Sequence, residues 1–121
     1  MSHPPFASAL ERRFSARPHV GVVTHFEGLD VPAVIARVHE VMRDAGLHPE
    51  GAVEQLGDRS VFNAVAAVPA GDGMELWLIA NEQPGVGSKI EVRLFHAIED
   101  SAQADEYLAT FAGRLGRVRD A

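Results

Sequence analysis

The sequence predicts a single α+β domain in two layers, with a mostly antiparallel five-stranded sheet and helices on one face. The main observation is the stretch from Gly51 to Ala97, where four short apolar segments alternate with period two between turn residues, as in an antiparallel meander. Apolar stripes at helical spacing flank this stretch on both sides. A valine-rich segment before the first long stripe supplies a fifth strand. The predicted order is α-β-α-β-β-β-β-α.

Length and composition fit one ordinary globular domain. The chain has 121 residues, of which 46% are hydrophobic and 23% charged, a balance that argues against disorder. It contains no cysteine, which excludes disulfides and thiolate metal sites. Because no signal peptide or membrane-spanning run is visible, we expect a cytoplasmic protein without a membrane partner. Residues 1–4 and 117–121 are expected to fray.

The net charge of −6 lies mostly in the second part of the chain. Residues 1–50 carry five Lys or Arg against six Asp or Glu, whereas residues 51–121 carry six against eleven. Binding to phosphates needs clustered cations. The one basic cluster, Arg114, Arg117 and Arg119, falls at the end of a predicted helix, where it complements the macrodipole. We therefore expect no nucleic-acid partner.

Three elements precede the meander. Apolar residues four apart predict a short amphipathic helix over about residues 5–14, and a strand follows over 19–26. The helix over 31–45 has the clearest pattern, because its apolar residues form one continuous stripe. Asp30 is suited to cap its first turn and Gly46 to end it.

The meander and a last helix complete the fold. The predicted strands are 52–56, 61–68, 74–80 and 89–98. Turn residues separate them over 57–60, 69–73 and 81–88, the last connection being the longest. Asp100 or Ser101 caps the final helix, whose apolar stripe ends near Leu115.

Successive strand residues point to opposite faces of the sheet, so the alternation predicts which face each residue joins. The core face receives Val61, Val65, Ala67, Met74, Leu76, Leu78, Ile90, Val92 and Leu94. The opposite face, called the outer face below, receives Phe62, Ala64, Ala66, Glu75, Trp77, Ile79, Lys89, Glu91, Arg93 and Phe95. The outer face is thus half apolar, which is unusual for a sheet face in contact with water.

Two explanations of the apolar outer face remain open. In the first, the N-terminal helix folds over it and brings Phe6, Leu10 and Phe14 against its aromatic residues. In the second, another protein chain covers it, because apolar patches rich in Trp and Phe mark interfaces. The partner-binding residues would then be Phe62, Trp77, Ile79 and Phe95.

The candidate catalytic and metal motifs fail on spacing. His39 begins a sequence like the zinc-protease motif, but Arg43 stands where the second histidine is needed. Residues 85–89, Gly-Val-Gly-Ser-Lys, resemble a phosphate loop, but Ser precedes Lys and the segment leads into a strand. We therefore expect no metal and no cofactor.

Two classes of function follow. We favour a non-catalytic protein-binding module, such as an adaptor, immunity or chaperone-like protein, which forms a homodimer through the outer face. The alternative is a small-molecule-binding protein or an enzyme with a cavity between helices and sheet. Its polar contacts would come from His25, Glu54, Asn63 and His96. If Ala80 pairs with Ile90, ideal strand spacing separates Asn63 from His96 by roughly 16 Å, too far for one ion.

Overall fold

The computed structural model describes residues 6–28, 30–69, 73–83, 85–97 and 100–120, and it confirms the predicted fold class and order of elements. The helices are α1 (Phe6–Arg13), α2 (Val31–Asp44) and α3 (Ser101–Asp120). The strands are β1 (His19–Glu27), β2 (Glu50–Leu56), β3 (Arg59–Ala67), β4 (Glu75–Gln83) and β5 (Gly87–Phe95).

The five strands form one antiparallel sheet in the order β1-β5-β4-β3-β2. The sequence left the position of the first strand open. In the structure β1 lies at the edge beside β5, and β2 forms the opposite edge. From β2 to β5 each strand pairs with the next, as predicted for a meander.

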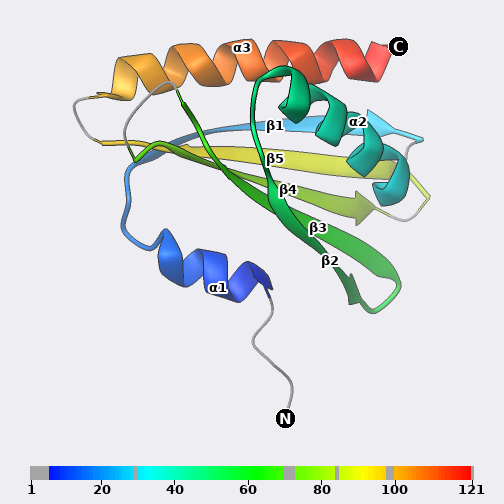
Figure 1. Cartoon of the computed structure of the whole chain (residues 1–121). Helices are drawn as coiled ribbons and strands as arrows, with labels where there is room; N and C mark the ends of the chain where they lie inside the picture. Colours follow the sequence, from blue (N-terminus) through cyan, green and yellow to red (C-terminus); the bar gives the residue numbers. More distant parts are fainter. Residues whose placement is uncertain (1–5, 29, 70–72, 84, 98–99, 121) are drawn as a thin grey trace.

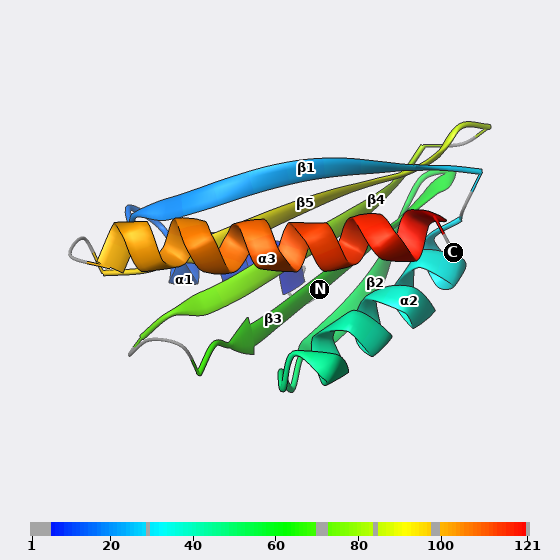
Figure 2. The ribbon, with the colours of Figure 1, turned by 90° about the horizontal axis from the view of Figure 1, so that it is seen from above.

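The helices divide between the two faces of the sheet. α2 and α3 cover one face, as predicted, whereas α1 lies alone on the other (Figure 1). Seen from above, α3 runs along β1 and β5 while α2 lies on the side of β2 (Figure 2). The main core fills the space between the two long helices and the sheet, and its side chains include Met42, Leu76, Leu78, Ile90 and Phe111.

α2 begins and ends where the sequence predicts. Asp30 is extended, and its carboxylate accepts a hydrogen bond from the Ala33 backbone N–H at 3.0 Å, which caps the first turn. Gly46, just past the end of the helix, has a φ of 76°, a conformation that glycine adopts without a Cβ penalty. The apolar stripe packs into the core through Val31, Val34, Val38, Val41 and Met42.

The predicted faces of β3 are wrong by one residue. Asn63 pairs with Ile79, and Ala64 with Leu78, so Phe62, Ala64 and Ala66 join the main core under the helices. Their neighbours Val61, Asn63 and Val65 point to the outer face instead. The error arose because β3 is apolar on both faces, so that period two does not identify the buried one, and a slip of one residue reverses every side chain.

The β4–β5 hairpin is longer and tighter than predicted, since most of residues 81–88 belong to the two strands. The start of β5 lies close against the end of β1. An ideal Cβ on Gly87 would lie 2.1 Å from the carbonyl oxygen of Phe26, so only glycine fits there. The Gly28 N–H also donates to the Val86 carbonyl at 2.8 Å. The glycines of this segment therefore serve strand packing.

The last helix begins at Ser101 and continues to Asp120, beyond the end near residue 115 that the apolar stripe predicts. Residues 1–4 and 121, which are expected to fray, lie outside the described residues. Within the described ranges, none of the helices combines the length and the apolar character needed to cross a membrane.

Candidate functional site

A small second core, called the outer aromatic cluster below, lies on the outer face of the sheet. It consists of Leu10 from α1, Phe14 from the turn directly after α1, Val65 from β3, Trp77 from β4 and Phe95 from β5. Each of these side chains is at most 5% exposed. Half-buried Ile79 packs against the margin of the cluster. α1 therefore covers the predicted outer face, which is the first of the two explanations that the sequence left open.

The aromatic rings of the cluster are stacked. The Phe14 ring lies 4.2 Å from the Phe95 ring at an interplanar angle of 10° and 5.9 Å from the Trp77 ring at 26°. In the sheet, Glu75 pairs with Phe95 and Arg93 with Trp77, which makes Trp77 and Phe95 diagonal neighbours on one face. The two strands thus form a flat aromatic surface, and the turn after α1 places the Phe14 ring on it.

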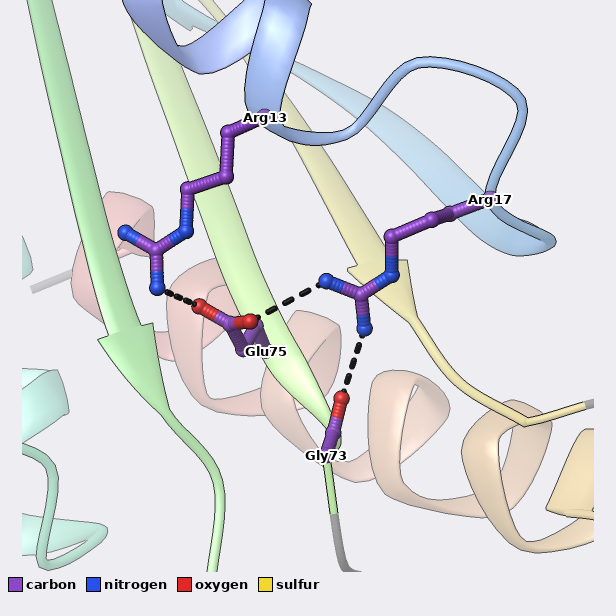
Figure 3. A network of polar contacts seen from close by, with 4 residues as sticks. All are labelled: Arg13, Arg17, Gly73 and Glu75. Carbon is purple, nitrogen blue, oxygen red and sulfur yellow. Dashed lines mark hydrogen bonds and ion pairs between the residues drawn. The ribbon is translucent and has the colours of Figure 1, made fainter.

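Arginines surround the stacked rings and fix the end of α1. The Arg13 guanidinium donates to the Glu75 carboxylate, and Arg17 donates both to Glu75 at 3.0 Å and to the Gly73 carbonyl at 2.7 Å (Figure 3). Both guanidinium carbons also lie 5.3 Å from the centre of the Phe14 ring. Glu75 therefore holds two cations over the aromatic surface, where each can make a cation–π contact.

A fourth charged group completes the margin of the site. The Arg93 guanidinium lies 5.0 Å from the Trp77 ring and donates to Glu91 at 2.6 Å. Nearby, a surface pocket of about 250 Å³ opens beside the end of α1. Its lining residues are Arg13, His48, Glu50, Val65, Ala66, Ala67 and Glu75. The site therefore combines an apolar floor with a rim that carries both positive and negative charges.

The link from α1 to β1 contains a strained residue. Ala16 has a φ of 61°, a left-handed conformation that costs a residue with a Cβ about 1–2 kcal/mol. The Arg17 N–H donates to the Phe14 carbonyl at 3.2 Å, which closes the turn. The fold tolerates this strain because the turn brings α1 back across the outer face.

Asn63 lies beneath the cluster and has an unfilled donor. Its side-chain oxygen accepts a hydrogen bond from the Trp77 indole at 3.0 Å. Because an indole N–H only donates, this bond fixes the orientation of the amide. The Asn63 Nδ2 then points away from Trp77, is buried, and meets no acceptor among the described residues. Such a buried donor costs about 1–3 kcal/mol.

The structure divides the predicted partner-binding residues. Trp77 and Phe95 form the floor of the cluster and Ile79 its margin. The placement of Phe62 on this face is wrong: it is buried in the main core, where the His39 ring of α2 lies 5.8 Å away. The outer face instead receives Val65, which the alternation had placed on the core face, and Asn63.

The four residues of the alternative small-molecule site do not come together. His25 and Glu54 lie in one row across the sheet but on its opposite edges, about 19 Å apart at ideal strand spacing. Asn63 bonds Trp77. His96 is buried at the end of β5, with its Nδ1 2.7 Å from the Ala97 carbonyl. No group of three or more His, Asp or Glu in the described ranges is placed to hold a metal ion.

A smaller pocket of about 160 Å³ lies between the end of α2 and α3. It is lined by Asp44, Ala45, Tyr107, Thr110, Phe111 and Arg114. The Tyr107 hydroxyl is buried and has no hydrogen-bond partner in the described part of the chain. Burial raises the pKa of Tyr107, while the nearby positive charge of Arg114 lowers it to a smaller extent. None of the four predicted ligand residues lines this pocket.

The outer aromatic cluster is the part of the described structure that best fits a binding role. It offers flat aromatic area and guanidinium groups, which are enriched where proteins meet, and a carboxylate that accepts hydrogen bonds from two arginines. The sequence missed the contributions of Glu75, Arg13 and Arg17, because nothing local connects residues so far apart in the chain. The chain matches no model of a known protein family, and no curated protein is significantly similar to it.

Proposed function

We propose that the protein is a non-catalytic, cytoplasmic protein-binding module whose outer face accepts an amphipathic helix of a partner protein in the place that α1 occupies. The observation that carries this proposal is the outer aromatic cluster, in which a helix of only eight residues and the turn after it cover an aromatic surface with two anchoring side chains, Leu10 and Phe14. Helix-in-groove recognition uses such anchors at spacings of three or four residues.

The attachment of α1 is weak enough for a partner to compete. Isolated helices shorter than about 12–15 residues are marginal in water, so α1 depends on its contacts with the sheet. Burial of Leu10 and Phe14 stabilises the docked helix by about 1.5–3 kcal/mol each. The strained Ala16 offsets part of this gain. A separate helix with the same anchors would make the same contacts without that strain.

The chemistry of the site describes the expected partner helix. Val65, Trp77 and Phe95 favour an aromatic and an aliphatic anchor four residues apart, as in α1. Glu75, whose side chain is 18% exposed, favours a basic residue next to the aromatic anchor. Because α1 of the same chain already buries Trp77 and Phe95, the two aromatic floors cannot meet directly in a homodimer. The occupant proposed here is a helix of a different protein that displaces α1.

The test uses the one tryptophan of the chain, Trp77, as a reporter. Leu10→Asp places a charge in the cluster and should release α1, which shifts the Trp77 emission to longer wavelength. Ala9→Asp changes the exposed side of the same helix and should leave the emission unchanged. A labelled peptide spanning residues 5–18 then serves as the partner helix in fluorescence anisotropy.

We expect the peptide to bind the Leu10→Asp protein at least tenfold more tightly than the wild type, in which α1 competes. A peptide carrying Ser at both anchor positions should not bind. Circular dichroism confirms that the Leu10→Asp protein is folded. If the folded variant does not bind the peptide, the outer face is not a receptor for a helix.

A further inference from the structure

The free edge of β1 carries a second interaction surface, separate from the outer aromatic cluster. β1 spans nine residues at one border of the sheet, and β2 forms the other border. No backbone other than that of β5 pairs with β1 in the described part of the chain. A long edge strand with unpaired backbone groups is a template for pairing with another strand.

Two hydrogen bonds determine which residues point to this free edge. The Gly28 N–H donates to the Val86 carbonyl at 2.8 Å, and the His96 N–H donates to the Pro18 carbonyl at 3.1 Å. Both pairs continue the register of β1 and β5. In an antiparallel ladder, hydrogen-bonded pairs alternate with pairs that are not bonded. The even-numbered residues of β1 therefore bond β5.

The odd-numbered residues consequently direct their N–H and C=O groups away from the sheet. They are His19, Gly21, Val23, His25 and Glu27, and all five are exposed. The middle residue, Val23, is 50% exposed. Natural edge strands are usually protected by lysine, proline or a bulge. β1 contains neither lysine nor proline, and its register with β5 is unbroken.

We propose that two copies of the chain associate by antiparallel pairing of their β1 strands about a two-fold axis at Val23. A two-fold interface joins each residue to its counterpart in the reverse order. Val23 then lies opposite Val23 of the second copy, Gly21 opposite His25, and His19 opposite Glu27. These are the residues whose backbone groups point outward, so each pair can exchange two hydrogen bonds. The two sheets become one.

The side chains of β1 support a second copy as the occupant. The pairing centred on Val23 aligns the full length of both strands, from His19 to Glu27. At each end, a histidine ring N–H lies opposite a carboxylate, and no two like charges are opposed. The other edge strand, β2, spans only seven residues and offers fewer backbone groups to a second copy. β1 is therefore the self-complementary edge.

This interface leaves the outer aromatic cluster accessible. Because the axis runs perpendicular to the sheet, the helices of both copies lie on one side of the joined sheet and both α1 helices on the other. The His19 ring lies 5.1 Å from the Phe95 ring, so the paired strands border the cluster. The inference nevertheless does not depend on the proposed function, because self-association and binding of a partner helix have different tests.

The first experiment places a cysteine at the axis of this cysteine-free chain. Hydrogen-bonded antiparallel pairs have Cα atoms about 5.5 Å apart, within the range of a disulfide. Val23→Cys should therefore form a disulfide-linked dimer under mild oxidation. Val53→Cys is the matched control, because Val53 is 55% exposed and lies on the opposite edge. We expect cross-linking of Val23→Cys to be at least tenfold faster.

The second experiment uses solution mass from light scattering, with the wild type expected to be a dimer. Val23→Pro removes an N–H that β5 does not use, so it is compatible with the folded monomer and should halve the mass. Glu27→Lys should weaken the dimer at least tenfold, and the double variant His19→Glu, Glu27→Lys should restore it. A monomeric wild type at 100 µM (about 1.3 mg/ml for a chain of 13.0 kDa) overturns the proposal. A Val23→Pro protein that stays dimeric overturns it equally, because the interface must then lie elsewhere.

Discussion

Replacing Phe14 with alanine separates the stability of the outer aromatic cluster from that of the main core. Phe14, directly after α1, is 4% exposed, and its ring stacks on those of Phe95 and Trp77. Truncating a fully packed phenylalanine costs about 3–5 kcal/mol when the surrounding structure must stay in place. Here the cost has an upper limit, because α1 can detach and leave the sheet folded. The measured loss should then equal the smaller docking free energy of α1.

Phe111 provides the matched control, because it is 2% exposed and lies in the main core, where no local detachment limits the loss. With a urea m-value of about 2 kcal/mol/M, Phe111→Ala should lower the unfolding midpoint by about 1.5–2.5 M. Phe14→Ala should lower it by a smaller amount, because detachment of α1 limits the loss. At the same time it should shift the Trp77 emission already without denaturant.

Two probes decide the outcome. Circular dichroism follows the unfolding of the whole sheet, whereas Trp77 fluorescence follows the contact with α1. In the Phe14→Ala protein the two signals should no longer change together. If they coincide and the midpoint falls as far as for Phe111→Ala, α1 belongs to the cooperative core, and a partner helix could not replace it.

Three further predictions concern single groups. Glu75→Gln removes the negative charge that Arg13 and Arg17 share. Because these ion pairs are partly exposed, the free energy of unfolding measured by urea titration should fall by about 1 kcal/mol, and 0.5 M NaCl should reduce this difference between the variant and the wild type. Gly87→Ala places a methyl group against the Phe26 carbonyl and should lower the Tm by about 8 °C or more. At Gly113, by contrast, an added Cβ would meet no atom within 4 Å, so Gly113→Ala should raise the free energy of unfolding by about 0.5–1 kcal/mol. Burial raises the pKa of Tyr107 in the folded state, so as the pH rises this hydroxyl ionises in the unfolded chain before it ionises in the folded protein. The contribution of Tyr107 to stability should therefore be full below pH 10 and fall as the pH rises above it. Tyr107→Phe should weaken the fall in Tm measured from pH 9 to 11.

The sequence was sufficient to predict the bounds and the buried face of those elements whose apolar pattern allows only one interpretation. α2 has a single apolar stripe between a capping aspartate and a glycine, and the structure has it almost as predicted. In β3, by contrast, apolar residues occupy both faces. The correct register depends on the pairing of Asn63 with Ile79, and that pairing is set by contacts across the whole sheet. Phe62 was misplaced for this reason.

The binding site was predictable only in part. The alternation of β4 and β5 placed Trp77 and Phe95 on the outer face, where the structure has them. The ion pairs of Glu75 with Arg13 and Arg17 join residues 62 and 58 positions apart, and no local pattern connects them. The role of Asn63 was hidden by the error in β3. A lone buried tryptophan nevertheless needs an acceptor for its indole N–H, and Asn63 is the amide that supplies it.

The position of β1 in the sheet has a consequence for the order in which the chain can acquire its structure during synthesis. β2 to β5 pair with their neighbours in sequence, so these hairpins can form as each strand leaves the ribosome. β1 is made before all of them, yet its partner β5 ends only at Phe95. At about 5–20 residues per second, the 68 residues between Glu27 and Phe95 take roughly 3–14 s. For that time β1 has two unpaired edges instead of one, and α1 has no Phe95 on which to stack. The N-terminal fifth of the chain therefore waits longest between its synthesis and its pairing, and its strand edges stay exposed for that time.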